Sequence, residues 1–260
     1  MSGALDPHVL AEAEARLGAI HERIERACEA AGRDPAEVNL VGACKRQPAE
    51  RIAALVCAGL SELGENYVQS AVTSQAELGV RLENHFGDAD APTPRWRMIG
   101  HLQRNKAAQA VETFGAVDSV DSARLARALA TRAREAGVVL EICLQVNLSG
   151  EQSKSGCAEA EVGGLLAECA QLPDLRVVGL MTLPAPGSGP ESARPAFARL
   201  RALRDTLSRE PGGGALHHLN MGMSQDLEVA IEEGSTLVRV GTDLFGERPA
   251  SGRNPEPGTI

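Results

Sequence analysis

Charged and polar residues stand where three apolar runs of the sequence end, and their types could bind a small molecule. Lys45 follows the run 39–44, and Ser224 and Gly241 end two further runs near the carboxyl end. A neutral lysine amine condenses with aldehydes. Hydroxyl groups and backbone N–H groups at the start of a helix bind phosphate. These residues predict a site for a ligand with an aldehyde, a phosphate, or both.

Each of these residues also has a simpler structural interpretation. Lys45 could extend from a strand end into solvent. Ser224 could cap the predicted helix 224–233, and Gly241 could allow a turn. The functional interpretation therefore depends on whether the fold brings the three segments together.

Short apolar runs alternate with helix-like segments over most of the chain, which is typical of a parallel sheet with covering helices. Eight strand–helix repeats in about 250 residues match a (β/α)8 TIM barrel of the α/β class. The predicted strands are 39–44, 60–66, 96–100, 116–121, 140–147, 176–182, 216–222 and 237–241, and the helix-like segments include 49–58, 103–114, 122–136, 158–171, 192–208 and 224–233.

An amphipathic helix precedes the first predicted strand. Apolar residues recur every three or four positions from Asp6 to Ala31, Asp6-Pro7 is a helix-start signal, and Gly32 is a stop signal. We expect its apolar face to pack on the rest of the protein. No repeat or linker divides the chain, so we predict a single domain, with an N-terminal helix in 1–35, the barrel in 36–248 and a flexible tail in 249–260.

In a TIM barrel the carboxyl ends of all strands meet at one face, where binding sites form. Lys45 would stand at the end of the first strand. The loops after strands seven and eight, which often bind phosphate, contain Ser224, Gly241 and Thr242. An amine facing a phosphate site in a barrel suggests pyridoxal 5'-phosphate as the ligand.

Long blocks of the sequence resemble the pyridoxal phosphate homeostasis protein family, also called the YggS/PROSC family. The resemblance runs in order from Lys45 to Arg248. It implies a barrel like the N-terminal domain of alanine racemase, a coenzyme held as a Schiff base, and a role in vitamin B6 homeostasis with apo forms of coenzyme-dependent enzymes as partners. The blocks are VGACKRQP, GENYVQ, RWRMIGHLQRNK, LQVNLSGEQSKSG, VVGLMTLPAP, MGMSQDLEVAIEEGST and VRVGTDLFGERP.

The resemblance also implies roles for individual residues of these blocks. They would form the Schiff base, lie close to the coenzyme, hold its phosphate and face its pyridine nitrogen. The Schiff base is assigned to Lys45, the place close to the coenzyme to Asn66 of GENY, and the contact with the pyridine nitrogen to Arg239 of VRVG. The phosphate is assigned to Ser224 of MGMS with Gly241 and Thr242 of VGT, and Met223 of MGMS is expected to contact the coenzyme.

The chain departs from the family's usual pattern in two places. CKRQP stands where SKTxP is usual, so Cys44 places a thiol beside Lys45 and could change its reactivity. LNMGMS replaces LSMGMS, which puts Asn220 where serine is usual. Neither change removes an implied contact.

Three functions fit these observations. A guanidinium at Arg239 discourages protonation of the ring nitrogen and weakens the coenzyme as an electron sink, which favours a carrier without turnover. The alternative is an amino acid racemase on the same barrel, which would need a second base and a further domain; nineteen residues follow Gly241, and Tyr67 is the only tyrosine. A third possibility is a barrel that binds another phosphorylated metabolite without a covalent bond.

Composition narrows the class of protein. The net charge of -9 disfavours binding of nucleic acid. No apolar stretch is long enough for a membrane span or shaped like a signal peptide, so we expect a cytoplasmic protein.

The six cysteines lack metal or CxxC spacing, which indicates reduced structural thiols. With 2% aromatic residues, no apolar patch suggests a dimer, and we expect a monomer.

Several other residues carry weaker signals. His217-His218 lacks any accompanying metal-ligand spacing, so a core or rim position is the better interpretation. His101 could line the pocket or cap the following helix, and Tyr67 and Lys106 could support the site. The sequence contains no GxSxG, Walker or GxGxxG motif.

Overall fold

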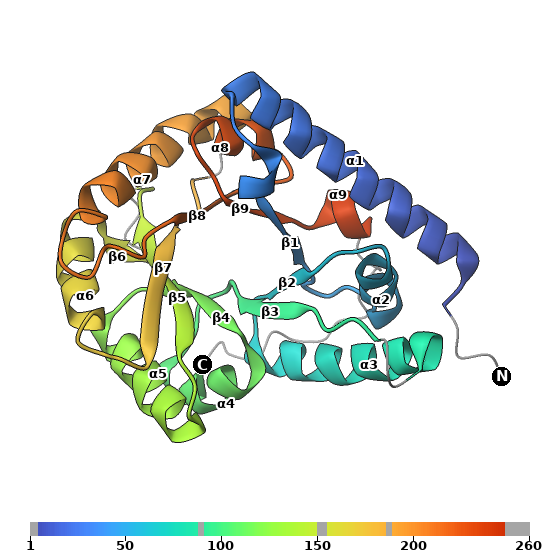
Figure 1. Ribbon diagram of the computed structural model, residues 1–260, viewed down its shortest axis with the longest axis horizontal. Coiled ribbons are helices and arrows are strands. Elements are labelled where there is room, and N and C mark those ends of the chain that lie inside the picture. Colours follow the sequence, from blue (N-terminus) through green and yellow to red (C-terminus); the bar gives the residue numbers. More distant parts are fainter. Residues whose placement is uncertain (1–4, 88–90, 150–154, 186–188, 248–260) are drawn as a thin grey trace.

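Eight parallel strands form a closed barrel in the computed structural model, which describes residues 5–87, 91–149, 155–185 and 189–247 (Figure 1). The ring runs β4-β3-β2-β1-β9-β8-β7-β5 and closes through pairing of β4 with β5. The predicted (β/α)8 barrel is confirmed. Its strands are β1 (Asn39–Ala43), β2 (Glu62–Glu65), β3 (Arg95–Met98), β4 (Ala116–Val120), β5 (Leu140–Asn147), β7 (Leu175–Met181), β8 (His218–Met223) and β9 (Leu237–Val240).

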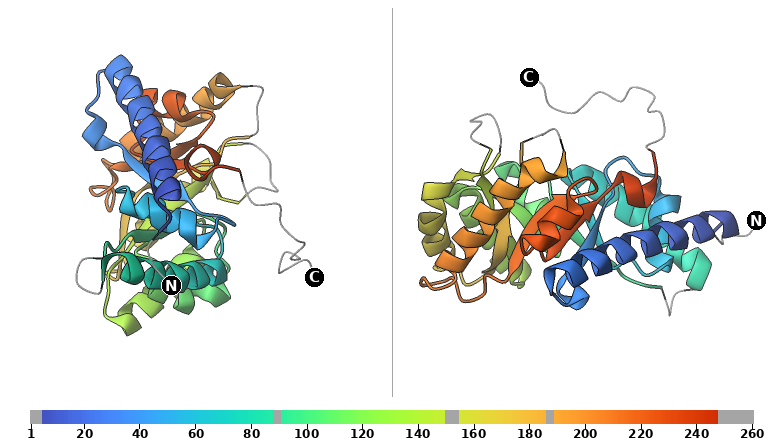
Figure 2. Two further views of the ribbon diagram at one scale, coloured as in Figure 1. Left: turned by 90° about the vertical axis from the view of Figure 1, so that its right-hand side faces the viewer. Right: turned by 90° about the horizontal axis from the view of Figure 1, so that it is seen from above.

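Helices surround the barrel and cover the outer side of its strands (Figures 1 and 2). The α-helices are α1 (Pro7–Ala31), α2 (Ala49–Cys57), α3 (Val68–Phe86), α4 (Ala107–Thr113), α5 (Ala123–Ala136), α6 (Val162–Cys169), α7 (Arg194–Leu207), α8 (Leu227–Glu232) and α9 (Thr242–Phe245). Short 3-10 helices are η1 (Pro35–Glu37), η2 (Arg104–Lys106), η3 (Glu159–Glu161) and η4 (Pro190–Ala193).

The eight predicted strands are all present, with ends that shift by one or two residues. The structure also contains the long helix α3, the short helices η1 and α9, and the two-residue strand β6 (Cys157–Ala158), which pairs with β5. The predicted helix 158–171 is wrong at its start, because β6 and η3 precede α6. The predicted tail 249–260 lies outside the described residues.

The N-terminal helix forms as predicted and packs across one side of the barrel. Asp6 caps it by accepting a hydrogen bond from the His8 N–H at 2.8 Å, and Gly32 ends it with a left-handed φ of 63°. Its buried side chains face α2, α8 and α9, and Figure 2 shows it running along these elements. The buried positions are Ala13, Leu17, Ile20, Ile24, Ala27 and Cys28.

The apolar core lies mainly between the strands and the helices. The interior of the barrel is different, because charged and amide side chains from several strands meet there. All six cysteines are free thiols, as the sequence predicts, and five of them are buried. In the described part of the chain, no helix combines the length and apolar character needed to cross a membrane.

Candidate functional site

The register of four neighbouring strands brings most of the predicted site residues to one end of the barrel. Met223 at the end of β8 pairs with Arg239 of β9, and Gly42 of β1 pairs with Val240. On the other side of β1, Ala43 pairs with Gly64 of β2. The residues that follow these pairs therefore lie side by side at the carboxyl ends of the strands, and they include Lys45, Asn66, Ser224, Gly241 and Thr242.

Lys45 lies in a tight turn between β1 and α2. The turn is closed by a 2.8 Å hydrogen bond from the Gln47 N–H to the Cys44 carbonyl, and Arg46 within it has a left-handed φ of 60°. The Lys45 side chain is half-buried, and its Nζ lies 5.4 Å from the ring centroid of Tyr67, a distance suited to a cation–π contact. The amine is thus held at the barrel mouth by an aromatic neighbour.

Glu65 is a buried acid near Lys45 that the sequence interpretation did not select. Its side chain is only 2% exposed and accepts a 2.8 Å hydrogen bond from the Asn66 N–H. Burial raises the pKa of Glu65, while the hydrogen bonds from the Asn66 and Tyr67 N–H groups and the charge of Lys45 act in the opposite direction. Glu65 fixes the backbone of Asn66 and adds a titratable group beside the amine.

Asn66 lies where two loops approach closely. A Cβ on Gly100 would stand 2.4 Å from the Asn66 carbonyl oxygen, so only glycine fits at position 100. A pocket of ≈ 340 Å³ opens next to Asn66 at this side of the mouth. It is also lined by Ile99, Gly100, His101, Gln145, Ser155, Leu183 and Pro184.

The loop after β8 has a different shape from the predicted one. Ser224 was expected to start a helix, but residues 224–226 form a turn and α8 begins at Leu227. The cause is Asp226, whose carboxylate accepts a 2.6 Å hydrogen bond from the Met223 N–H and closes the turn. The expected helix start at Ser224 is therefore wrong, while a contact of Ser224 with phosphate stays a prediction. Met223 is 40% exposed and Ser224 is half-buried on this turn.

Gly241 follows β9 next to the end of β1, and Thr242 is the first residue of α9. A Cβ on Gly241 would stand 3.7 Å from the Ala43 carbonyl oxygen, which places Gly241 against β1 just before Lys45. The Gly241 carbonyl accepts hydrogen bonds from the N–H groups of Leu244 and Phe245 at 3.0 and 2.9 Å, which fold the chain into α9. Thr242 is exposed at this edge.

Arg23 of α1 connects the loops after β8 and β9. Its guanidinium donates to the Ser224 carbonyl at 2.8 Å, to Glu228 of α8 at 2.7 and 3.0 Å, and to Asp243 of α9 at 2.9 Å. One side chain of the N-terminal helix thereby holds together two loops that the sequence predicts to bind phosphate. The sequence interpretation treated α1 only as a packed helix and missed this residue.

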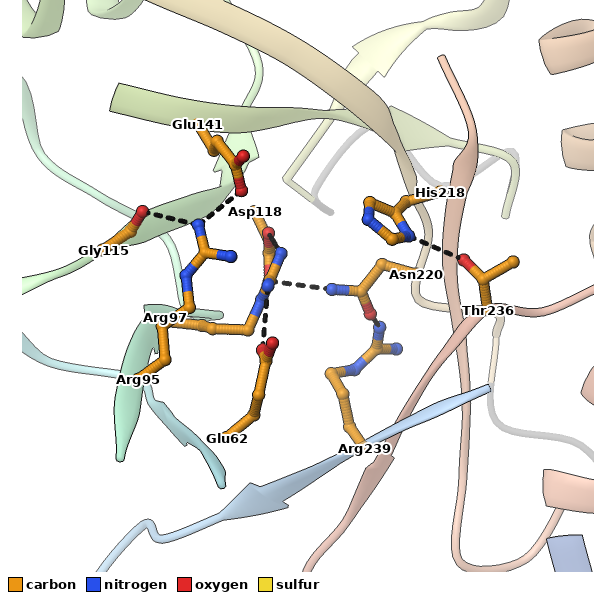
Figure 3. A network of polar contacts seen from close by, with 10 residues as sticks. All are labelled: Glu62, Arg95, Arg97, Gly115, Asp118, Glu141, His218, Asn220, Thr236 and Arg239. Carbon is orange, nitrogen blue, oxygen red and sulfur yellow. Dashed lines mark hydrogen bonds and ion pairs between the residues drawn. The ribbon is translucent and has the colours of Figure 1, made fainter. Parts of the chain in front are cut away.

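Arg239 extends from β9 into the barrel and is only 3% exposed. It donates one hydrogen bond to the Asn220 side-chain oxygen (Figure 3) and a second to the Thr182 carbonyl at 3.1 Å. Burial lowers the pKa of Arg239 to about 10, although Asp118 and Asp226 counteract this effect. Arg239 therefore remains charged at neutral pH.

The barrel interior continues the network away from Arg239. Asn220 donates to Asp118 at 2.9 Å, and Asp118 accepts two hydrogen bonds from Arg97 at 2.7 and 2.8 Å. Arg97 also pairs with Glu62 at 2.9 Å (Figure 3). Asn220 is one of the two positions where the sequence departs from the family pattern, and the structure gives it a contact to Arg239.

The other polar residues singled out in the sequence lie apart from this cluster or have ordinary partners. His218 begins β8 at the opposite end of the barrel and contacts the Thr236 hydroxyl at 3.1 Å, which fits a core or rim position. His101 faces Asp121 at 3.6 Å, does not cap a helix, and lines the pocket beside Asn66, which is one of the two positions expected for it. Lys106 is exposed in η2. Among the described residues, no group of three or more His, Cys, Asp or Glu could hold a metal ion.

The Cys44 thiol, which the sequence places beside Lys45, is buried and neutral. It is 1% exposed and donates a hydrogen bond to the Gly42 carbonyl at 3.1 Å. Burial, reinforced by the charge of Glu65, raises the pKa of Cys44 well above its usual value. A Cys44 thiolate that could attack an aldehyde ligand beside Lys45 is therefore disfavoured.

Signals for most of the missed residues were present in the sequence. Arg97 and Asp118 stand between apolar residues of their strands, and a charged residue within a buried strand indicates a polar interior contact. Glu65 directly precedes Asn66 at the same strand end. Arg23 had no such signal, because it is one of many charged residues on an amphipathic helix.

Two comparisons place the chain among known sequences. Residues 15–249 match the family model described as "Alanine racemase, N-terminal domain". The pyridoxal phosphate homeostasis protein of Pseudomonas aeruginosa is 45% identical over 233 residues, which cover 89% of this chain and 94% of that protein. The protein of the same name from Aquifex aeolicus is 41% identical and covers 90% of this chain and 97% of its own length.

Solved structures agree with this grouping. PipY of Synechococcus elongatus, determined with PLP bound, has a TM-score of 0.73 at 36% identity and covers 86% of this chain and all (100%) of its own. Alanine racemase of Clostridium difficile has a TM-score of 0.65 at 14% identity, with 88% of this chain and 56% of that chain covered, and so shares the fold. The chain belongs to the pyridoxal phosphate homeostasis protein family and has the barrel of the alanine racemase N-terminal domain.

Proposed function

We propose that the protein binds pyridoxal 5'-phosphate at the carboxyl end of the barrel and maintains the supply of this coenzyme in the cell, without a turnover reaction of its own. The relatives that share 45% and 41% of the sequence are named for pyridoxal phosphate homeostasis. PipY, at 36% identity, has a structure with the coenzyme bound. The coenzyme would be carried on the Lys45 amine as a Schiff base.

One observation carries this proposal. The pairing of β8 with β9 and of β9 with β1 places an amine, two polar loops and a buried guanidinium on three adjacent strands. The coenzyme has a matching group for each of them: an aldehyde for the amine, a phosphate for the polar loops and a pyridine nitrogen for the guanidinium. The residues present fit it.

Each residue has a task that follows from its chemistry. Ser224 and Thr242 offer hydroxyl groups, and Gly241 offers backbone that can approach a phosphate closely. Met223 shapes the first loop, Asn66 borders the site from the side of β2, and Lys45 supplies the amine. When bound, the coenzyme supplies an aldehyde that can exchange between amines.

Arg239 limits what the bound coenzyme can do. A buried arginine remains protonated and can donate a hydrogen bond to the ring nitrogen, but it does not transfer its proton as a carboxylic acid would. An unprotonated ring is a poor acceptor of electrons from a substrate carbanion. This property favours storage and transfer of the coenzyme over racemisation or transamination.

The finer features of this proposal are delivery to apo forms of coenzyme-dependent enzymes, a monomeric state, a cytoplasmic location and a single-domain organisation. Each follows from the sequence argument given above. The first can be measured by mixing the loaded protein with such an apoenzyme and following the gain of that enzyme's activity, and the second by light scattering.

The covalent site is tested with lysine variants, because the sequence contains three lysines, Lys45, Lys106 and Lys154. We expect the protein to gain visible absorbance when mixed with the coenzyme, and borohydride to fix the adduct on the peptide that contains Lys45. Lys45→Ala should lose both, whereas the matched control Lys106→Ala should keep both. An unchanged spectrum in Lys45→Ala would contradict the assignment.

The racemase alternative has a separate readout. Purified loaded protein incubated with single enantiomers of amino acids should leave them unchanged, as judged by chiral chromatography. Racemisation at rates typical of enzymes, about 1 per second or faster, would replace the carrier proposal with that alternative.

A further inference from the structure

The side-chain amide of Asn220 lies between an acid and the guanidinium of Arg239. Its nitrogen donates to Asp118 at 2.9 Å, and its oxygen accepts from Arg239 (Figure 3). Asn220 and Asp118 are 0% exposed, and Arg239 is 3% exposed. The three side chains therefore form a line inside the barrel, with Arg239 at the end near the proposed ring site.

The chemistry of the two partners fixes the direction of the amide. A carboxylate only accepts hydrogen bonds and a guanidinium only donates them. The amide of Asn220 satisfies both by turning its NH2 group to Asp118 and its oxygen to Arg239. A reversed amide would face donor to donor and acceptor to acceptor, so this orientation is enforced.

The Asp118 end of this line of side chains is fixed by further contacts. Asp118 accepts two hydrogen bonds from Arg97, and Arg97 in turn pairs with Glu62. These residues come from β2, β3 and β4, on the side of the barrel away from β9. Asn220 thus connects Arg239 to a buried ion pair whose geometry is fixed from three strands.

Asn220 also separates two opposite charges. A guanidinium that could reach Asp118 directly would form the paired, two-bond contact that Arg97 makes. The amide occupies that position, and Arg239 makes its two hydrogen bonds to neutral oxygens, one from Asn220 and one from Thr182. Within the described residues, the Nε of Arg239 donates to no protein atom, so this N–H remains available to a ligand.

We propose that Asn220, supported by Asp118, is a positioning residue that holds Arg239 away from the interior carboxylate and directs its free N–H toward the coenzyme ring. This inference rests on the proposed binding of pyridoxal phosphate. It assigns a function to a residue that touches only Arg239 and Asp118 through its side-chain hydrogen bonds. It also gives the interior acid an indirect role in the site.

The experiment compares Asn220→Leu, Asn220→Ser and Arg239→Met with the wild type. Leucine has a similar volume but neither donor nor acceptor, so Arg239 should turn toward Asp118. We expect the dissociation constant for pyridoxal phosphate to rise roughly tenfold. We also expect the ring nitrogen, observed by NMR with ¹⁵N-labelled coenzyme, to lose its arginine-dependent shift. Asn220→Ser, which keeps a donor and an acceptor, should recover part of both signals.

A double-mutant cycle distinguishes positioning from a general loss of packing. If Asn220 acts through Arg239, the Asn220→Leu change should have little further effect on affinity in an Arg239→Met background. Ser119→Ala is the matched control, because Ser119 is a buried neighbour of Asp118 whose hydroxyl has no hydrogen-bond partner in the described part of the chain. It should leave the NMR signal unchanged. Thermal unfolding of each variant reports folding separately.

The outcomes separate the two proposals. Failure of the wild type to bind pyridoxal phosphate would overturn the proposed function. Binding by the wild type with an unchanged ring-nitrogen signal in Asn220→Leu, or with additive effects in the cycle, would overturn the positioning role alone. If Asn220→Leu does not fold, the same signal measured in Asn220→Ser decides, because its shorter side chain should move the signal part of the way toward that of Arg239→Met.

Discussion

Arg97 and Arg239 are two buried arginines in one barrel, and their surroundings are opposite. Arg97, on β3, is 1% exposed and pairs with two carboxylates, Asp118 and Glu62. Arg239, on β9, is 3% exposed and bonds to an amide oxygen and a backbone carbonyl. Burial opposes the charge of both side chains, but the carboxylates raise the pKa of Arg97, whereas the pKa of Arg239 falls to about 10.

This difference distinguishes a buried charge that is paired within the fold from a buried charge that can act on a ligand. A buried ion that is fully paired stabilises its neighbours and offers little to a ligand. A buried ion with neutral partners costs stability, and proteins keep such groups mainly where they act on something else. Arg97 therefore belongs to the scaffold, and the surroundings of Arg239 support its proposed place in the site.

The largest expected loss of stability comes from replacing Arg97, the arginine that is paired with carboxylates. Arg97→Met leaves Asp118 and Glu62 without their cation inside the barrel, and we expect the free energy of unfolding to fall by about 3–5 kcal/mol. Urea denaturation measures the change. Arg95→Met is the matched control on the same strand, because Arg95 pairs with Glu141 near the surface, where an ion pair contributes at most about 1 kcal/mol. Equal decreases in the free energy of unfolding of Arg97→Met and Arg95→Met would contradict the assignment of Arg97 to the scaffold.

Arg23 provides an intermediate case, because it has carboxylate partners but lies partly in solvent, with 23% of its side chain exposed. We expect Arg23→Ala to lower the unfolding free energy by about 1 kcal/mol. It should also weaken coenzyme binding several-fold, since it frees the loops after β8 and β9. Arg26→Ala, which removes a more exposed i,i+4 pair with Glu22 on the same helix, should change neither. An unaltered affinity in Arg23→Ala would show that the loops keep their shape without it.

His218 is a partly buried titratable side chain that is neutral, in contrast to the two buried arginines, which are charged. Burial, with a further contribution from His217, lowers the pKa of His218 from 6.5 to about 4. The unfolded chain therefore takes up a proton below pH 6.5 that the folded protein does not take up until about pH 4, and stability is lost as the pH falls through this range. His218→Gln should reduce this acid-dependent loss of unfolding free energy by roughly 1 kcal/mol, because solvent partly screens the side chain.

The measurement for His218 is urea denaturation at pH 7 and pH 5. Wild type and His218→Gln should differ in the slope of stability against pH. The exposed variant His8→Gln should follow the wild type. A slope in His218→Gln as steep as that of the wild type would assign the acid sensitivity to other groups.

The smallest expected change in stability comes from Arg239. Arg239→Met removes a buried charge that has only neutral hydrogen-bond partners, so the free energy of unfolding should stay within about 1 kcal/mol of the wild type or rise. Coenzyme affinity should nevertheless fall. A destabilisation as large as that of Arg97→Met would erase the distinction between the two arginines.

The fold was predictable from the sequence because its signals are periodic and local. Apolar runs alternating with helical segments, and helix signals such as Asp6-Pro7 and Gly32, depend on neighbouring residues. The helix start at Ser224 was wrong because Asp226 accepts a hydrogen bond from the Met223 N–H and closes a turn first. A competing side-chain contact of this kind is not visible in the apolar pattern.

The candidate site was predictable in part. Residues at the ends of runs, such as Lys45 and Gly241, could be selected because a barrel brings strand ends together. Arg23 and the pairing of Asn220 with Arg239 could not, because they depend on contacts between residues far apart in sequence and on side-chain direction. Their roles toward the coenzyme remain predictions.

The contacts of the first helix and first strand with the last elements have a consequence for synthesis of the chain. Arg23 holds loops that begin 201 residues later, and β1 completes its pairing only with β9. During translation, α1 and β1 leave the ribosome long before β9 and α9 have been synthesised. A chain that stops before β9 and α9 would lack part of the proposed coenzyme site, so we expect binding of pyridoxal phosphate to require translation through these elements.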